Sequence, residues 1–469
     1  MLSNSMDGTW RELLRADRVA RLALVCLGIW LNAADALVTA TAMPSIVRDI
    51  GGYAYFAWPV AVYLLGAIVG GASAGRLSER GGLRWALIVP AIIYLVGCAI
   101  SAVAPSIAFF LVGRALQGAG AGLVVGACYV AMGALFPNEL WRRVLGAISG
   151  VWGIATLLGP LLGGLFAEHG LWRLLFWVFA VQALIFALAA WKLVPAHTAE
   201  TSNTRIPIRT LVILGFAIVG FMIAGVAGSL GLSVLAVVVG TVLFVTALRV
   251  DTRAPAHLFP RRVADITKSA GRGYVALFAF CASAVGFGVY GAAILQTLYG
   301  LSPLIAGYVI GADAMGWTIA ALIVGEFPQS WDRACIRFGG TLIFFGVASL
   351  AYTLNSGSLA LVLVSAIVLG AGFGACWAYV TRAILEYLPE SERAVGSSAI
   401  PAVQMIGNAI GSAASGMIAN GLGLADGITR ADASALSFWL FVAVIPVGLF
   451  GWACAWGLSA PRHTQTANA

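Results

Sequence analysis

Hydrophobic residues are gathered along this chain into long runs, and short polar segments separate the runs. An α-helix rises about 1.5 Å per residue, so about 20 apolar residues cross the roughly 30 Å hydrocarbon core of a bilayer. Fourteen runs are predicted to be such helices: 19–43, 54–75, 85–105, 107–135, 142–167, 173–194, 208–227, 231–249, 272–299, 303–326, 338–354, 357–385, 394–421 and 434–459. The ten-residue alternation typical of a membrane β-barrel is not seen. The pattern therefore predicts an all-α polytopic membrane protein.

Two polar linkers, at about 195–207 and 250–271, flank a pair of short apolar runs. Without this pair, six predicted spans remain on each side, as an internal duplication would produce. We therefore predict three regions: an N-terminal six-helix bundle over 1–194, a linker with two inserted transmembrane helices over 195–271, and a C-terminal six-helix bundle over 272–469.

Basic residues alternate between the two ends of the predicted spans. If the N-terminus is cytoplasmic, 23 of the 27 basic residues lie at the cytoplasmic ends of the spans. The four exceptions are Arg48, Arg114, Arg173 and Arg430. This is the positive-inside distribution, and with an even number of spans it predicts that both termini are cytoplasmic. The net charge of +8 is then explained without a nucleic acid partner.

Composition excludes several classes of protein. With 61% hydrophobic and 10% charged residues, the chain differs from soluble globular proteins, in which about 25% of residues are charged. It has no Walker loop and no His-Glu-x-x-His motif, and its four histidines have no metal-ligand spacing. We therefore expect no enzymatic activity, no cofactor and no metal.

Three charged residues fall inside the predicted spans. Asp35 is the only charge within 19–43, where an acid at the bilayer centre costs about 2.5 to 3.5 kcal/mol. Counted along the helices, Asp35, Arg114 and Asp313 lie some 10 to 15 Å below the outer surface, so they share a layer and can face one water-filled cavity. Pro44 is expected just past the end of the first span.

The three charges suggest proton coupling. An Asp beside an arginine stays ionised, whereas an Asp that loses the arginine in lipid-like surroundings takes up a proton. We interpret Asp35 as the main protonation site, Arg114 as its modulator, and Asp313 as a second site that binds a proton or attracts a cationic substrate. The alternative is that Asp35 and Arg114 form a static buried pair that only fixes helix packing.

Other polar and aromatic residues within the spans are candidates for a substrate cavity. Tyr290 and Trp317 could line an adaptable apolar cavity or stack on a cation. Gln296, Gln404 and Asn408 could supply neutral hydrogen bonds there. Ordinary packing and hydrogen bonds between helices are the alternative interpretations.

A short polar segment, from Gly75 to Arg84, is predicted as a tight inside loop. Gly75 would let two helices approach, Glu79 would pair with an arginine or cap a helix, and Gly82 would permit the turn. Arg80 and Arg84 supply positive charge. A generic short basic loop is the alternative.

The fifth predicted span carries Gly159, Pro160, Gly163 and Gly164. These residues should bend the helix and allow close contact with a helix of the other half, at a place where sliding opens or closes a path. Ordinary packing of small residues is the alternative.

Several of these segments resemble motifs of one family. The 75–84 segment resembles the signature loop of the major facilitator superfamily, with Glu79 where an Asp is usual, and its second-half copy is reduced to Trp331-Asp332-Arg333 with Arg337. Four further segments resemble motifs of that superfamily or of its fourteen-span drug:proton antiporter branch: 114–120, 159–164, 31–44, where Ala34 replaces a usual Leu, and 295–307. The resemblance implies two six-helix bundles plus two inserted helices, and protonatable acids in spans one and ten, at Asp35 and Asp313.

These observations predict a proton-coupled exporter of lipophilic or cationic drugs that works by alternating access. We expect it in a bacterial inner membrane as a monomer, with a small-molecule substrate, protons and the lipid bilayer as its partners. A transporter of one specific metabolite with the same fold is the first alternative. A channel or a membrane-embedded enzyme is less well matched, because rings of identical charge and catalytic clusters are not seen.

Overall fold

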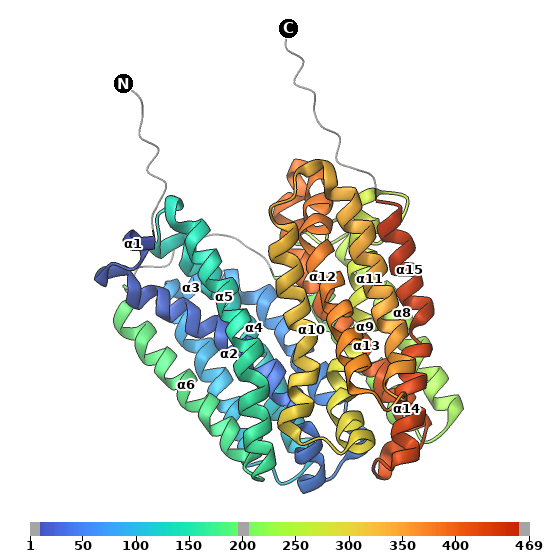
Figure 1. The fold of residues 1–469 in the computed structure, drawn as a ribbon. Coiled ribbons are helices and arrows are strands. Elements are labelled where there is room, and N and C mark those ends of the chain that lie inside the picture. Colours follow the sequence, from blue (N-terminus) through green and yellow to red (C-terminus); the bar gives the residue numbers. More distant parts are fainter. Residues whose placement is uncertain (1–9, 196–205, 459–469) are drawn as a thin grey trace, which may run out of the picture.

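The computed structural model describes residues 10–195 and 206–458, and all regular structure in these ranges is helical (Figure 1). The α-helices are α1 Trp10–Leu13, α2 Ala16–Ile50, α3 Trp58–Ala102, α4 Ile107–Leu135, α5 Trp141–Glu168, α6 Trp172–Leu193, α7 Ile208–Val226, α8 Leu230–Asp251, α9 Ser269–Tyr299, α10 Pro303–Val324, α11 Asp332–Thr353, α12 Leu359–Tyr387, α13 Arg393–Gly421, α14 Arg430–Val442 and α15 Ile445–Trp456. Short 3₁₀ turns lie between some of them, including η1 Tyr53–Tyr55 and η5 Leu424–Asp426.

Within the described residues, 12 helical stretches are long and apolar enough to cross a membrane. The prediction of an all-helical, multi-pass membrane protein is thereby confirmed. One of the stretches, Tyr53–Ala102, has 50 residues, more than twice the length that a bilayer requires. Its helical geometry is interrupted at Gly82, whose φ is 72° and ψ is 163°.

The helices form two groups (Figure 1). Helices α2 to α6 lie in one group and α9 to α15 in the other, and α8 lies beside the second group near α15. Helix α5 of the first group packs on α2 and on α10 of the second group, and α13 packs in the same way on α9 and α3. Each of these two helices therefore contacts one helix of its own group and one helix of the other group.

The two groups meet at one end of the molecule and diverge toward the opposite end, which carries α1 and the C-terminal end of α15 and which we call the termini end (Figure 1). At the closed end, Ser412 donates a hydrogen bond to the carbonyl oxygen of Ala57 at 3.0 Å, and Asn420 donates to that of Ala54 at 2.7 Å. The rings of Phe56 and Tyr290 stack with centroids 4.9 Å apart. Hydrogen bonds and an aromatic contact therefore hold this end together.

Two sequence expectations about helix ends are wrong. Pro44 lies inside α2, which continues to Ile50 and ends at Gly51, where φ is 73°. The buried side chains of Ile46 and Val47 pack into the core, and this tertiary packing stabilises the helix beyond the proline. The 75–84 segment is also helical as far as Gly81, so the predicted loop is reduced to a sharp break at Gly82.

Candidate functional site

An ion pair lies buried within the first group of helices. Nη1 of Arg114, on α4, donates to both carboxylate oxygens of Asp35, on α2, at 2.9 and 2.8 Å. Asp35 is 0% and Arg114 1% exposed. Thr39, one helical turn after Asp35, also donates to its carboxylate at 3.3 Å. The opposite charges and these hydrogen bonds compensate for the cost of removing both groups from water.

Uncharged side chains extend this pair into a network. Arg114 donates to Oε1 of Gln117 at 3.2 Å, and Ser101 donates to the same oxygen at 2.9 Å. The guanidinium lies 4.3 Å from the ring centroid of Tyr63, whose hydroxyl donates to Asn32 at 2.8 Å. Nε of Arg114 is buried and has no hydrogen-bond partner among the described residues. The network therefore holds the arginine firmly through one nitrogen and leaves another unsatisfied.

The sequence contained part of this network. Gln117 follows Arg114 by three residues, and Asn32 precedes Asp35 by three, spacings that place each pair on one helix face. Tyr63 lies on a different helix and has no comparable signal in the sequence. Sequence reasoning missed its role because the contact depends on how α3 packs against α4.

Asp313 on α10 is not among the hydrogen-bond partners of the buried pair. Its side chain is half-buried and has no ion-pair partner within residues 10–195 and 206–458. The hydrogen-bond partners of Asp35, by contrast, all come from the first group of helices. The expectation that the two acids face one water-filled cavity is not met in this conformation, because Asp35 has no exposed surface.

The predicted cavity residues are distributed over three helices. Tyr290 on α9 is buried at the closed end, where it lines a small cavity with Tyr53 and Phe56. Trp317 on α10 stacks on Phe373 at 5.2 Å, with the two rings 4° from parallel. The remaining candidates are half-buried: Gln296 on α9, whose Nε2 is buried without a hydrogen-bond partner among the described residues, and Gln404 and Asn408 on α13. Their role in binding stays a prediction.

The residues of the 75–84 segment have different environments. Arg84 donates from Nε to the carbonyl oxygen of Val194 at 2.7 Å and lies over the ring of Trp191 at 5.2 Å. Glu79 is half-buried and Arg80 is exposed. Gly75 was expected to allow a close helix approach, but a Cβ atom placed there meets nothing within 4 Å. Close packing of helices therefore does not require a glycine at position 75.

The glycine motif of α5 lies where this helix passes between α2 and α10. A Cβ atom at Gly159 would lie 2.7 Å from Leu37, and one at Gly163 would lie 2.8 Å from the carbonyl oxygen of Val38. At Gly164 it would lie 2.3 Å from Cα of Leu304, on α10.

The proline of the motif faces the same helix, because Pro160 lies against the sites where Gly307 and Gly311 would carry side chains. The carboxylate of Glu168 also accepts a hydrogen bond from the backbone N–H of Leu304 at 3.3 Å. This part of α5 forms a close contact between the two groups of helices.

The second group has an ion pair at the termini end. Nη1 of Arg382, on α12, donates to both oxygens of Asp332, at the start of α11, at 3.1 Å each. Asp332 is 2% exposed. The reduced copy of the signature loop thus retains one buried acid, and its partner comes from a helix that the motif does not include.

Comparison with known proteins adds relatives to this geometry. The chain is 29% identical over 439 residues to a probable multidrug-efflux transporter of Mycobacterium tuberculosis, covering 89% of this chain and 90% of the relative. It is 27% identical over 420 residues to multidrug resistance protein Stp of the same species, covering 86% of this chain and 76% of the relative. Multidrug transporter protein MdtP of Bacillus subtilis is 24% identical over 433 residues, with 87% and 77% covered.

Solved structures share the fold. A D-xylose-proton symporter superposes with a TM-score of 0.67 at 18% identity, covering 94% of this chain and 98% of the other. A nucleoside transporter, NupG, superposes with a TM-score of 0.66 at 12% identity, covering 93% and 99%. Residues 25–412 match the family model of the Major Facilitator Superfamily. The chain therefore belongs to the Major Facilitator Superfamily, a family of membrane transporters and not of enzymes.

Proposed function

We propose that this protein is a fourteen-span, proton-coupled antiporter that exports lipophilic or cationic drugs by alternating access. The observation that carries the proposal is the fully buried pair of Asp35 and Arg114. The names of the relatives in Mycobacterium tuberculosis and Bacillus subtilis, which refer to multidrug efflux, multidrug resistance and multidrug transport, support the substrate class.

The pair provides a coupling device. While Arg114 holds Asp35, the adjacent positive charge favours the ionised form of the carboxylate. If a rearrangement of α2 against α4 separates the two groups, the carboxylate is left in apolar surroundings and takes up a proton. Proton affinity then differs between conformations, and by linkage substrate affinity differs as well. Each proton that moves down a membrane potential of 100 mV supplies about 2.3 kcal/mol for export.

Asp313 is assigned the second role in the proposal. Its half-buried carboxylate, without an ion-pair partner in the described ranges, is suited to bind a proton or a cationic substrate. Trp317, one helical turn further along α10, lies in an aromatic cluster with Phe373 and Trp377. Aromatic faces and a carboxylate together are a suitable environment for a lipophilic cation.

The proposed topology has fourteen spans with both termini cytoplasmic. The break at Gly82 supports a division of α3 into two spans. The 29-residue helix α13 is long enough to cross the bilayer. It is not among the 12 stretches described above, because it contains many small and polar residues. The first described helix, α1, and the C-terminal end of the last, α15, lie at the same end of the molecule (Figure 1), as an even number of spans requires. The inserted pair is then α7 and α8, between bundles over 1–194 and 272–469.

Alternating access in this proposal uses the contacts of α5 with α10 and of α13 with α3. Small residues at both crossings let the backbones approach closely, so one bundle can rock against the other with few side chains to repack. The present conformation, closed at the end away from the termini, is one of the two end states of that cycle.

Transport of a fluorescent cationic dye into energised inverted vesicles tests the proposal. Wild-type protein should accumulate the dye, a protonophore should abolish the accumulation, and Asp35→Asn should abolish it without loss of folded protein. Asp49→Asn is the matched control, because Asp49 lies on the same helix but is exposed and pairs with Arg173. Normal export by Asp35→Asn contradicts the coupling role, and dye movement that ignores the protonophore contradicts antiport.

A further inference from the structure

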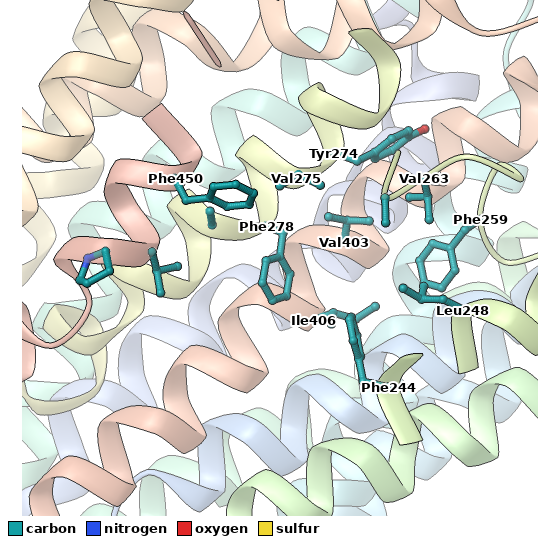
Figure 2. Close-up of a pocket in the computed structure, with 14 residues that line it drawn as sticks. Phe244, Leu248, Phe259, Val263, Tyr274, Val275, Phe278, Val403, Ile406 and Phe450 are labelled. Carbon is teal, nitrogen blue, oxygen red and sulfur yellow. The ribbon is translucent and has the colours of Figure 1, made fainter. Parts of the chain in front are cut away.

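A groove that plays no part in the proposed transport path lies at the side of the second group of helices. It has a volume of about 500 Å³, and we call it the lateral groove. Its lining is almost entirely hydrocarbon: Phe244, Leu248, Phe259, Val263, Ala264, Tyr274, Val275, Phe278, Ala279, Val403, Ile406, Pro446, Val447 and Phe450. Figure 2 shows Phe278, Val403 and Ile406 between Phe450 on one side and Leu248 and Phe259 on the other.

The residues that line the lateral groove include none from α2 to α6, so the groove does not lie between the two groups of helices. Its walls come from α8, α9, α13, α15 and the segment between α8 and α9, and α8 is the least buried of the 12 stretches. On α15, Val447 is 37% and Phe450 49% exposed. The polar atom of Tyr274 is satisfied, since its hydroxyl donates to the carbonyl oxygen of Gly396 at 2.8 Å. The groove therefore offers an incoming molecule little besides apolar surface.

The groove extends to the depth of one leaflet. It begins at the end where α8 stops and α9 starts, the end that also carries the termini (Figure 1). Its deepest residues are Phe278 on α9, Pro446 on α15 and Ile406 on α13. They lie nine to thirteen residues from the ends of their helices, which corresponds to about 14 to 20 Å. Half of the hydrocarbon core measures roughly 15 Å, so the groove matches the length of one acyl layer.

Basic residues are close in sequence to one part of the groove lining. The segment between α8 and α9 contains Arg253, Arg261, Arg262 and Lys268, all exposed, and one acid, Asp265. The carboxylate of Asp265 already accepts hydrogen bonds from the backbone and hydroxyl of Thr267. This segment therefore carries a net positive charge within a few residues of the apolar lining.

A buried acid fixes this segment in place. The carboxylate of Asp251, 1% exposed, accepts hydrogen bonds from the backbone N–H groups of Leu258 and Phe259 at 2.9 Å each. Thr210 on α7 donates to the same carboxylate at 3.0 Å. Because Phe259 is held on the groove wall, Arg261 and Arg262 are kept at its rim.

We propose that the lateral groove is a binding site for an anionic phospholipid. An acyl chain fills the apolar groove, and the negatively charged phosphate headgroup lies against Arg261, Arg262 and Lys268. Basic pockets between transmembrane helices bind anionic headgroups by the same combination of charge and apolar surface. A lipophilic cation fits the apolar groove but not its basic rim, and this distinguishes a lipid from an exported drug.

Lipid binding to the purified full-length protein tests the assignment. Palmitoyl-oleoyl phosphatidylglycerol and phosphatidylcholine are titrated separately into detergent-purified protein, and native mass spectrometry gives the bound fraction. Wild type should bind phosphatidylglycerol more tightly. Arg261→Gln with Arg262→Gln should weaken that binding about 25-fold, since each basic residue near an anionic surface accounts for roughly a fivefold change. Lys192→Gln with Arg142→Gln, two exposed charges elsewhere at this end, is the charge-matched control and should change nothing.

A second pair of variants tests the groove itself. Val447→Trp fills it from the lipid side and should weaken binding of both lipids at least fivefold, whereas Leu449→Trp, on the same helix and 46% exposed but outside the groove, should not. Equal binding of the two lipids by wild type, or equal effects within either pair of variants, would overturn the proposal. Tighter lipid binding by a chain that ends at Leu458 would indicate that the residues after Leu458 occupy the groove. Displacement of the lipid by a cationic dye would indicate that the groove binds the dye.

Discussion

The two halves of this transporter place acids within the membrane in opposite ways. In the first half, Asp35 is fully buried and held by both hydrogen bonds that Arg114 makes to it. In the second half, Asp313 is only half-buried and has no ion-pair partner in the described ranges. The ion pair of Asp332 with Arg382 in the second half lies instead near helix ends, at the start of α11 and close to the end of α12. In the proposed mechanism, Asp35 must lose its ion-pair partner before it binds a proton, whereas Asp313 can bind one without losing an ion pair.

The largest expected effect on stability comes from removing one partner of the buried ion pair. Arg114→Leu leaves an uncompensated carboxylate in the core and should destabilise the protein by about 3 to 5 kcal/mol, seen as a large fall in thermal unfolding temperature in detergent. The double variant Asp35→Leu with Arg114→Leu should recover most of the stability and none of the export. A single variant as stable as wild type contradicts the view that the pair holds this half together.

The next effect concerns the contact where the two halves meet. Gly164→Val places side-chain atoms within 2.3 Å of the Leu304 backbone and should weaken the closed conformation by about 1 to 3 kcal/mol. Dye export should fall about tenfold. A cysteine introduced at the closed end should become more accessible to a thiol reagent. Gly153→Ala is the control, since a Cβ atom at Gly153, also on α5, meets nothing within 4 Å. Unchanged export by Gly164→Val would show that this crossing does not move.

A smaller effect on the free energy of unfolding is expected at Gly82, the helix break of the first half. Gly82→Ala forces a residue with a side chain into a positive φ of 72° and should cost about 1 to 2 kcal/mol. Gly75→Ala lies in an open part of the helix and should be neutral or slightly stabilising, because alanine is the better helix former. Thermal unfolding of both variants measures the difference, and equal unfolding temperatures would contradict the assignment of the turn to Gly82.

The smallest effect on stability is expected at Asp313. Because this acid has no ion pair in the described structure, Asp313→Asn should leave the unfolding temperature within a few degrees of wild type. Export of a cationic dye should nevertheless fall, with a rise in the apparent KM of about tenfold. A loss of stability comparable to that of Arg114→Leu would show that the two halves do not differ in the way proposed here.

The sequence predicted the helical class and the position of nearly every helix, because a bilayer requires about 20 apolar residues for each crossing. It also singled out Asp35 and Arg114, since charges in apolar runs are costly and need a reason to be there. The helical repeat also places Gln117 on the same helix face as Arg114, although no role was predicted for it. The error at Pro44 had a physical cause, because tertiary packing outweighed one lost backbone hydrogen bond.

The sequence by itself thus determined which segments enter the membrane and which of their residues are chemically exceptional. Only the tertiary structure decided which of these residues meet. Tyr63 lies beneath Arg114, Gly164 contacts Leu304, and the lateral groove collects residues from Phe244 to Phe450 on four helices and one connecting segment. Spacing within a helix is fixed locally by its repeat, whereas contacts between helices depend on the packing of the whole chain, and a single apolar pattern is compatible with many packings.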